Sequence, residues 1–299
     1  MQRASRYLFV VPALLVVLAT AFWPLARALA LAFQDWQLAR SDAPAWLWTP
    51  ADGLENARDL ALNFERMLED PLVWNSIKAT LFFTVTSVVL AVAIGLALAM
   101  LLSRGGPGKA LLRAILILPF VMSPALIGVS WRFMFNPEHG LFSALGRPFG
   151  GAMTDALGSE LLAPWVVVSA DVWHWAPYVT LMIMAALATV PQDAREAAAI
   201  DGARPWQVFR DITLPHIAPT LAVATVLKCI FALKAFDLIY TITGGGPGNV
   251  TQVLSHYIYF QGFKYFDLGY SAALAFLLIV PMAVLAWMYI RLSYREAAA

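Results

Sequence analysis

Six long apolar stretches alternate with polar segments along the chain. Each is long enough to cross the hydrocarbon layer of a membrane as a helix, which takes about 20 residues. They lie at 7–33, 76–102, 111–135, 164–190, 218–242 and 270–291. The pattern therefore predicts an all-α membrane protein with six transmembrane helices.

The first stretch allows a second interpretation, because Ala28-Leu29-Ala30 looks like a signal-peptide cleavage site. The apolar part of a signal peptide is usually about 7–15 residues long. This one is longer, so we favour a retained span.

Composition agrees with a membrane protein. The 299 residues are 61% hydrophobic and 13% charged, whereas soluble domains carry about 25% charged residues. The net charge of +1 gives no reason to expect a nucleic-acid partner. Cys229 is the single cysteine, so no intrachain disulfide can form.

Basic residues in the short loops predict the orientation. Arg and Lys dominate the N-terminus, the loop "SRGGPGKALLR" and the C-terminus, while 34–75 and 136–163 carry more acids than bases. Both termini are therefore expected in the cytoplasm of a bacterial cell, with 191–217 on the same side. Trp36, Trp46 and Trp48 are expected along the outer membrane interface.

This topology divides the chain into four parts. They are the N-terminus with the first span (1–34), an outer loop (35–75), a five-span core with a cytoplasmic loop at 191–217 (76–291) and a cytoplasmic tail (292–299).

Proline and glycine in the cytoplasmic loop 191–217 are placed as in a helical hairpin. Its seven charged residues would cost on the order of 20 kcal/mol inside the bilayer. Pro191 can open one helix and Gly202 can end it, while Pro205 can begin a second helix that Pro215 closes before the fifth span. Small residues around Gly202 suit close approach by another protein. A plain amphipathic hairpin on the inner membrane face is the alternative.

The hairpin resembles the EAA loop of permease subunits of bacterial ABC importers. The matching residues are Glu196, Ala197, Ala198, Asp201, Gly202, Ala203, Phe209, Ile212, Leu214 and Pro215. The segments "LPFVMSPALIGVSWRFMFNPEHG", "WHWAPYVTLMIMAALATVP" and "FDLIYTITGGGPGNVTQVLSHYIYFQGF" are similar to the maltose-permease-like branch, which carries sugars and glycerol phosphate.

The resemblance implies a type I ABC importer permease fold in the bacterial inner membrane. It also implies that the EAA loop couples to a cytoplasmic ATPase. The partners it implies are a second related permease chain in a heterodimer, two copies of that ATPase, and an extracytoplasmic solute-binding protein.

The chain itself has no recognisable ATP site. Its Gly-rich stretches "GGPGKA" and "GGGPG" lack the spacing of a P-loop. We therefore expect no cofactor in this chain, ATP and Mg²⁺ on the partner ATPase, and no enzyme activity of its own. The "GGGPG" stretch is either a flexible outer turn or a gate loop that touches a binding protein.

Polar groups inside spans are costly and suggest function. Asp171, His174, Trp175 and Tyr178 are expected on one face of the fourth span, and Lys234, Asp237 and Tyr240 on one face of the fifth. Such residues could line a path for a sugar. Alternatively, Lys234 and Asp237 form a structural pair, and Asp171 and His174 are merely hydrated near the end of their span.

Other polar residues carry weaker signals. Lys78 and Lys228 are expected to reach the membrane surface or the second permease. The four histidines are scattered, so no metal site is expected.

These features together favour an ATP-driven importer subunit for a sugar or polyol-like solute. A secondary transporter driven by an ion gradient is the alternative, although we see no duplicated repeat with broken helices. A membrane scaffold without transport is a further possibility.

Overall fold

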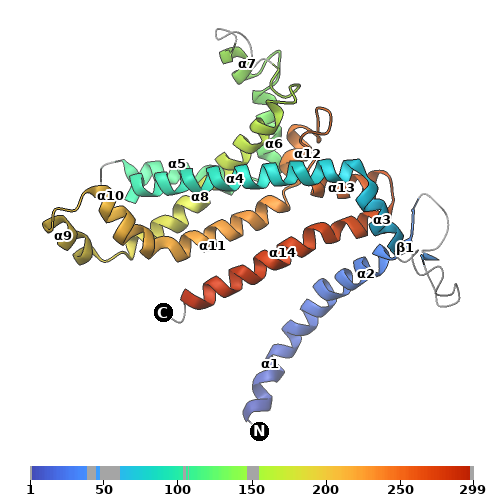
Figure 1. The fold of residues 1–299 in the computed structure, drawn as a ribbon, viewed down its shortest axis with the longest axis horizontal. Helices are drawn as coiled ribbons and strands as arrows, with labels where there is room; N and C mark the ends of the chain where they lie inside the picture. Colours follow the sequence, from blue (N-terminus) through green and yellow to red (C-terminus); the bar gives the residue numbers. More distant parts are fainter. Residues whose placement is uncertain are drawn as a thin grey trace. The chain divides into compact units, whose positions relative to one another are not determined.

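The computed structural model describes residues 2–38, 45–47, 61–103, 106, 108–146 and 155–296 (Figure 1). The chain forms two compact units. Unit 1 contains residues 1–74 and 257–279, and unit 2 contains residues 75–256 and 280–299.

Long helices dominate unit 2. Its main elements are α4 (Pro71–Ser103, which begins in unit 1), α5 (Lys109–Val121), α6 (Pro124–Met134), α7 (Leu141–Gly146), α8 (Ala163–Ala188), α9 (Gln192–Ile200), α10 (Pro205–Val208), a π-helical turn (Phe209–Thr213), α11 (Leu214–Leu233), α12 (Asp237–Ile242) and α13 (Leu254–Tyr259, which ends in unit 1). In Figure 1, α9 and α10 lie together at one end of the bundle formed by α4, α5, α8 and α11.

Unit 1 gathers the first helices and the beginning of the last. It contains α1 (Gln2–Val17), a π-helical turn (Leu18–Phe22), α2 (Trp23–Ala32), β1 (Gln34–Asp35) paired antiparallel with β2 (Ala45–Trp46), α3 (Leu62–Glu69), a π-helical turn (Phe260–Lys264) and the first part of α14 (Leu268–Glu296). Trp46 is exposed and Trp36 is half-buried, while Trp48 lies outside the described residues.

Five helical segments in the described part of the chain are long and apolar enough to cross a membrane. They are Val10–Ala32, Pro71–Ser103, Ala163–Ala188, Pro205–Leu233 and Leu268–Arg291. Each overlaps one of the predicted stretches, so the all-α membrane class is confirmed.

The third predicted span is not one straight helix. α5 and α6 meet at an angle of 99° between Val121 and Pro124. Met122 and Ser123 have extended backbone. The residue before a proline avoids the helical region, so Pro124 ends one helix and begins the next. The prediction of a continuous span over 111–135 was wrong at this point.

The fifth predicted span is also displaced along the chain. We expected Pro215 to end the second hairpin helix, but the helix runs unbroken from Pro205 to Leu233. A proline lacks the amide hydrogen that a regular helix needs at that position. The π-helical turn accommodates it, because the Leu214 amide bonds to the Phe209 carbonyl five residues back.

Glycine permits a close approach between α4 and α8. A Cβ atom on Gly95 would lie 2.7 Å from Cγ1 of Val179. Val179 is fully buried and belongs to an apolar core with Ile183 and Ile217. This packing joins α4, α8 and α11 toward the hairpin end of unit 2.

Basic side chains cap the end of α4. Lys109 donates to the Leu101 carbonyl at 3.0 Å, and Arg113 donates to the Leu102 carbonyl at 2.6 Å. The last carbonyls of a helix have no partner within it and carry partial negative charge. The loop that indicated orientation therefore also terminates this span.

A polar cluster holds unit 1 together around Asp70. This carboxylate accepts hydrogen bonds from the hydroxyls of Tyr257 and Tyr270, the latter at 2.8 Å. Both tyrosines are almost fully buried. Partial burial raises the pKa of Asp70, but the tyrosine and backbone hydrogen bonds outweigh it and leave the pKa below its usual value. Beside this cluster Arg66 pairs with Asp267 at 2.7 Å.

Replacing Asp70 with alanine should destabilise the protein. Two buried hydroxyls would lose their acceptor, and an unsatisfied buried group costs about 1–3 kcal/mol. Thermal unfolding of the purified transporter should therefore occur at lower temperature for Asp70→Ala, but not for Glu69→Ala, which removes an exposed acid next to it. Equal stability of the two variants would contradict the role of this cluster.

Candidate functional site

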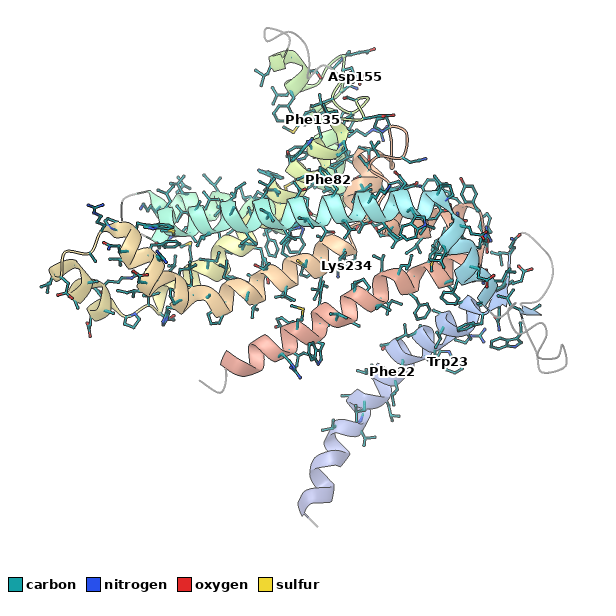
Figure 2. All side chains as sticks on the ribbon, in the orientation of Figure 1. Phe22, Trp23, Phe82, Phe135, Asp155 and Lys234 are labelled. Atoms are coloured by element: carbon teal, nitrogen blue, oxygen red, sulfur yellow. The ribbon has the colours of Figure 1, made fainter. Side chains whose placement is uncertain are left out.

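A cavity of about 120 Å³ in unit 2 brings the two predicted polar clusters together. Asp171, His174 and Trp175 reach it from α8, and Lys234 and Asp237 from the break between α11 and α12. The rest of the lining is Pro124, Phe231, Ala235, Phe236 and Leu238. Tyr178 and Tyr240 lie outside this lining. Figure 2 marks Lys234 where α11 ends.

A buried ion pair lies at the wall of this cavity. Lys228 of α11 donates to the carboxylate of Asp171 at 2.6 Å, and its side chain is fully buried. Ser87 of α4 donates to the same carboxylate. Asp171 is therefore not a hydrated surface group, and Lys228 does not reach the membrane surface or a second chain as predicted.

Lys234 and Asp237 do not form the pair that their spacing suggested. The ion pairs among the described residues do not include them. α11 ends at Leu233 and α12 begins at Asp237, so the two residues do not share a helix face. Each charge instead complements a helix dipole. The Lys234 ammonium lies at the C-terminus of α11, and the Asp237 carboxylate lies at the N-terminus of α12.

Aromatic rings surround Trp175. Its ring stacks on Phe231 at 4.4 Å, and Phe120 of α5 contacts the rings of His174, Trp175 and Tyr178. Tyr178 is therefore part of the aromatic packing rather than of the cavity wall. The Lys234 ammonium lies 4.7 Å from the centre of the Phe231 ring.

Sequence reasoning missed several residues that build this site. Phe120, Pro124, Phe231 and Phe236 carry no charge and looked like ordinary span residues. Ser87 and Lys228 are 84 and 57 residues from Asp171, so spacing gave no sign of their contact. The buried lysine in an apolar span was the one available signal.

The hairpin at 191–217 has the geometry that its glycine and prolines predicted. Gly202 has φ +76, and the Ala203 and Gly202 amides bond to the Ala198 and Ala199 carbonyls at 2.9 and 3.1 Å. This is a Schellman ending, which requires a left-handed residue. Pro205 begins α10, whose Gln207 side chain accepts a hydrogen bond from the Arg204 amide.

The tip of this hairpin exposes apolar side chains. Ile200 and Trp206 are 86% and 66% exposed, and α9 has no buried residue. Glu196 is exposed and accepts a hydrogen bond from Gln192. An apolar tip on otherwise polar short helices is typical of a protein-binding surface.

The remaining motif residues occupy different parts of the hairpin. Ala197 and Asp201 are exposed, Ala198 and Ala203 are half-buried, and Phe209, Leu214 and Pro215 lie on the continuous helix that follows.

The "GGGPG" stretch forms a compact, hydrogen-bonded turn. The hydroxyls of Thr243 and Thr251 share a hydrogen bond at 2.7 Å, and Thr251 donates to the Gly246 carbonyl. Asn75 donates to the Asn249 carbonyl at 2.7 Å. Burial lowers the pKa of nearby His256 to about 4, so that ring is neutral at neutral pH. The turn is held by these hydrogen bonds, which disfavours the interpretation as a flexible outer turn.

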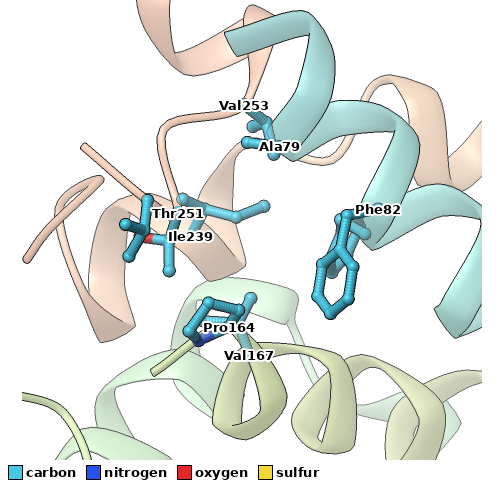
Figure 3. A pocket seen from close by; sticks show the side chains of 9 residues that line it. Ala79, Phe82, Pro164, Val167, Ile239, Thr251 and Val253 are labelled. Atoms are coloured by element: carbon cyan, nitrogen blue, oxygen red, sulfur yellow. The ribbon is translucent and has the colours of Figure 1, made fainter. Parts of the chain in front are cut away.

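One hollow between the helices next to this turn has almost no free volume. The hollow in Figure 3 measures about 10 Å³ and is lined by Phe82 of α4, Val167 of α8, Ile239 of α12 and Thr251, among others. That is about the room of one water molecule. A solute that uses the cavity near Asp171 therefore cannot pass through this hollow without helix movement.

A family model matches residues 91–296, and its description is binding-protein-dependent transport system inner membrane component. The chain is 38% identical over 207 residues to the trehalose/maltose transport system permease protein of Thermococcus litoralis, with 69% of each chain covered. It is 34% identical over 280 residues to the sn-glycerol-3-phosphate transport system permease protein of Agrobacterium fabrum, covering 93% of this chain and 91% of the relative.

The fold is similar to that of a solved transporter. A chain of the bacterial alginate ABC transporter, in complex with an alginate pentasaccharide-bound periplasmic protein, gives a TM-score of 0.79 at 20% identity. The alignment covers 99% of this chain and 96% of that one. The predicted importer permease fold is thereby confirmed.

The Asp171–Lys228 pair yields a stability prediction. Removing one member leaves an uncompensated buried charge, so Asp171→Ala or Lys228→Ala should destabilise the protein by about 3–5 kcal/mol. The double replacement Asp171→Leu with Lys228→Met should cost much less. Thermal unfolding of the purified transporter measures both, and Lys264→Met, at an exposed site, serves as the lysine control. Equal loss in the single and double variants would contradict the pairing.

Proposed function

The chain belongs to the family of binding-protein-dependent transport system inner membrane components, and on this premise we propose how it moves its solute and which solute it takes. As a multi-pass inner-membrane permease of an ABC importer it is a transport subunit rather than an enzyme. The ion-gradient alternative gains no support from this membership.

We assign coupling to the hairpin 191–217. Its exposed Ile200 and Trp206 offer an apolar tip, and the Schellman ending fixes the direction in which α9 projects. Such a rigid, small-residue element fits a groove on a separate ATPase, which holds ATP and Mg²⁺. Coupling residues on this hairpin are Glu196, Ala197, Ala198, Asp201, Gly202, Ala203, Phe209, Leu214 and Pro215.

Force reaches the solute site through one continuous helix. The segment Pro205–Leu233 begins in the hairpin and carries Lys228, the partner of Asp171. Trp206 and Lys228 are 22 residues apart, which corresponds to about 33 Å along a helix. Movement of the hairpin therefore shifts α11 at the wall of the cavity. This observation carries the proposed mechanism.

The charges around the cavity favour an uncharged solute. Asp171 and Lys228 neutralise one another, while Lys234 and Asp237 contribute one charge of each sign. Trp175 and Phe231 supply ring faces on which the apolar side of a sugar can stack. We therefore propose a neutral sugar or polyol, as in the trehalose/maltose relative, rather than glycerol phosphate.

The proposed assembly follows from the same premise. A second related permease chain completes a heterodimer, two copies of the ATPase engage the two cytoplasmic hairpins, and an extracytoplasmic binding protein delivers the solute. Basic loop residues support cytoplasmic termini. The compact turn at 243–253 then faces outward, where a binding protein would meet it.

A large side chain on the hairpin should uncouple solute uptake from the ATPase. Ala198→Trp adds a large side chain to a half-buried position of the hairpin, so docking of the ATPase should fail. We expect solute uptake to fall at least tenfold, a loss of about 1.4 kcal/mol or more in coupling, while the membrane fold survives. Uptake into proteoliposomes measures transport, and thermal unfolding measures whether the membrane fold survives. Asp155→Trp, at an exposed site away from the hairpin, is the control.

Cross-linking tests the same assignment independently of transport. Cys229 is the single cysteine and can be replaced by serine. In that background Ala198→Cys should cross-link to the ATPase and Asp155→Cys should not. Normal uptake by Ala198→Trp, or cross-linking only at Asp155→Cys, would refute the coupling role.

Solute class is tested with the reconstituted complex and its binding protein. Neutral disaccharides should stimulate ATP hydrolysis, whereas sn-glycerol 3-phosphate should not. Lys234→Met or Asp237→Asn should reduce uptake at low solute concentration about tenfold or more, because a hydrogen bond to a charged group contributes about 1.5–3 kcal/mol. Lys264→Met, at an exposed site outside the cavity, should leave uptake unchanged. Stimulation by the phosphate ester alone would overturn the proposed solute class.

A further inference from the structure

α4 and α8 run parallel in a fixed register along unit 2. Ser87 bonds to Asp171, Gly95 packs on Val179, and the rings of Phe82 and Trp165 meet edge to face at 5.4 Å. These partners are all separated by 83 or 84 positions. Two rows of side chains at intervals of four residues therefore follow each other on the outside of this helix pair.

Two hollows lie along these rows, and we call them together the groove. On α4 the row contains Phe82, Thr86, Leu90 and Ile94, and on α8 it contains Trp165, Ser169 and Trp173, so it is apolar apart from two small hydroxyl side chains. Trp165 and Trp173 are 45% and 44% exposed. Along Leu90 and Trp173 the groove widens to a hollow of about 500 Å³, which α5 closes on its third side.

The groove ends in a polar mouth. A second hollow of about 320 Å³ is lined by Phe82 and Trp165, whose rings are in contact, and by Asn75, Lys78 and Glu160. Lys78 and Glu160 are both exposed, and the ion pairs of the described residues do not join them. One cation and one anion thus border the same opening without neutralising each other directly.

We propose that this groove binds a phospholipid with a zwitterionic, amine-bearing headgroup, that is, a phosphatidylethanolamine. Lys78 meets the phosphate, Glu160 accepts hydrogen bonds from the primary ammonium, and one acyl chain lies along Phe82, Leu90 and Trp173. From Lys78 to Leu90 the helix rises about 18 Å, close to half of the roughly 30 Å hydrocarbon layer. The groove therefore has the length of a single leaflet.

The two charges favour a lipid over a helix from another chain. A partner helix could cover the apolar floor, but an occupant that binds both Lys78 and Glu160 has to present an acceptor and a donor at one opening. A single ethanolamine headgroup supplies both. Trp165 and Phe82 at the mouth match the aromatic belt that forms at the membrane interface.

The purified complex of this chain with its partner chains tests the proposal. Equal amounts of phosphatidylethanolamine, phosphatidylcholine and phosphatidylglycerol are offered in nanodiscs, and retained lipid is measured by native mass spectrometry. We expect phosphatidylethanolamine to be retained preferentially. Lys78→Met should reduce its retention about two- to fivefold, the range for an exposed charge pair. Lys264→Met is the exposed lysine control.

Glu160→Gln separates the two headgroup contacts. This variant should abolish the preference for phosphatidylethanolamine over phosphatidylcholine, because the quaternary ammonium of choline cannot donate hydrogen bonds. Retention of phosphatidylcholine itself should not change. The proposal would be overturned if neither substitution changed lipid retention, or if phosphatidylglycerol were retained more strongly than phosphatidylethanolamine.

A photoreactive amino acid in place of Leu90 identifies the occupant of the groove directly. Capture of lipid supports the proposal, and capture of the second permease chain refutes it. Neither result depends on transport, so the lipid site can fail while the proposed function stands.

Discussion

A charge placed inside an apolar bundle has to be neutralised there, and this constraint organises unit 2. Asp171 and Lys228 are both buried, and separating them would leave a charge in a low-dielectric interior at a cost of several kcal/mol. Ser87 adds a third helix to the contact. The Asp171 contact thus connects α4, α8 and α11. The cavity near Asp171, the continuous helix Pro205–Leu233 and the groove between α4 and α8 are all built from these helices.

The same tie supports the proposed coupling between the hairpin and the cavity. A bundle of independent helices would absorb a push at one end by sliding, since apolar contacts are not directional. α11 cannot slide freely past α8, because a shift of one turn would separate Lys228 from Asp171. The π-helical turn at 209–213 keeps the helix Pro205–Leu233 continuous despite Pro215. In the proposed mechanism, the ion pair and the π-helical turn together let α11 carry movement from the hairpin to the cavity.

Hydrophobicity was enough to predict the spans, and Gly202 with Pro205 was enough to predict the hairpin, because these features depend on local sequence. The break at Ser123–Pro124 was also local, and the sequence "PFVMSP" with two prolines could have revealed it. The Asp171–Lys228 contact could not be predicted in this way, since it depends on how two distant helices pack. The pairing of Lys234 with Asp237 was wrong because a three-residue spacing implies contact only within a continuous helix, and no glycine or proline marks the break.

Charges at helix ends give one physical account of several features that looked separate in the sequence. Lys109 and Arg113 satisfy the final carbonyls of α4, Lys234 follows the last residue of α11, and Asp237 begins α12. Each sign matches the dipole of its helix. The basic residues used to infer orientation therefore have a structural reason to lie beside span ends, independent of membrane insertion. Lys234 separates the effect of the helix dipole from that of membrane orientation. It follows the end of α11 beside the cavity and does not lie in a loop at the membrane surface. A lysine between two apolar helices is thus as much a sign of a helix break as of a binding site, and here it serves as both a cap and part of the cavity wall.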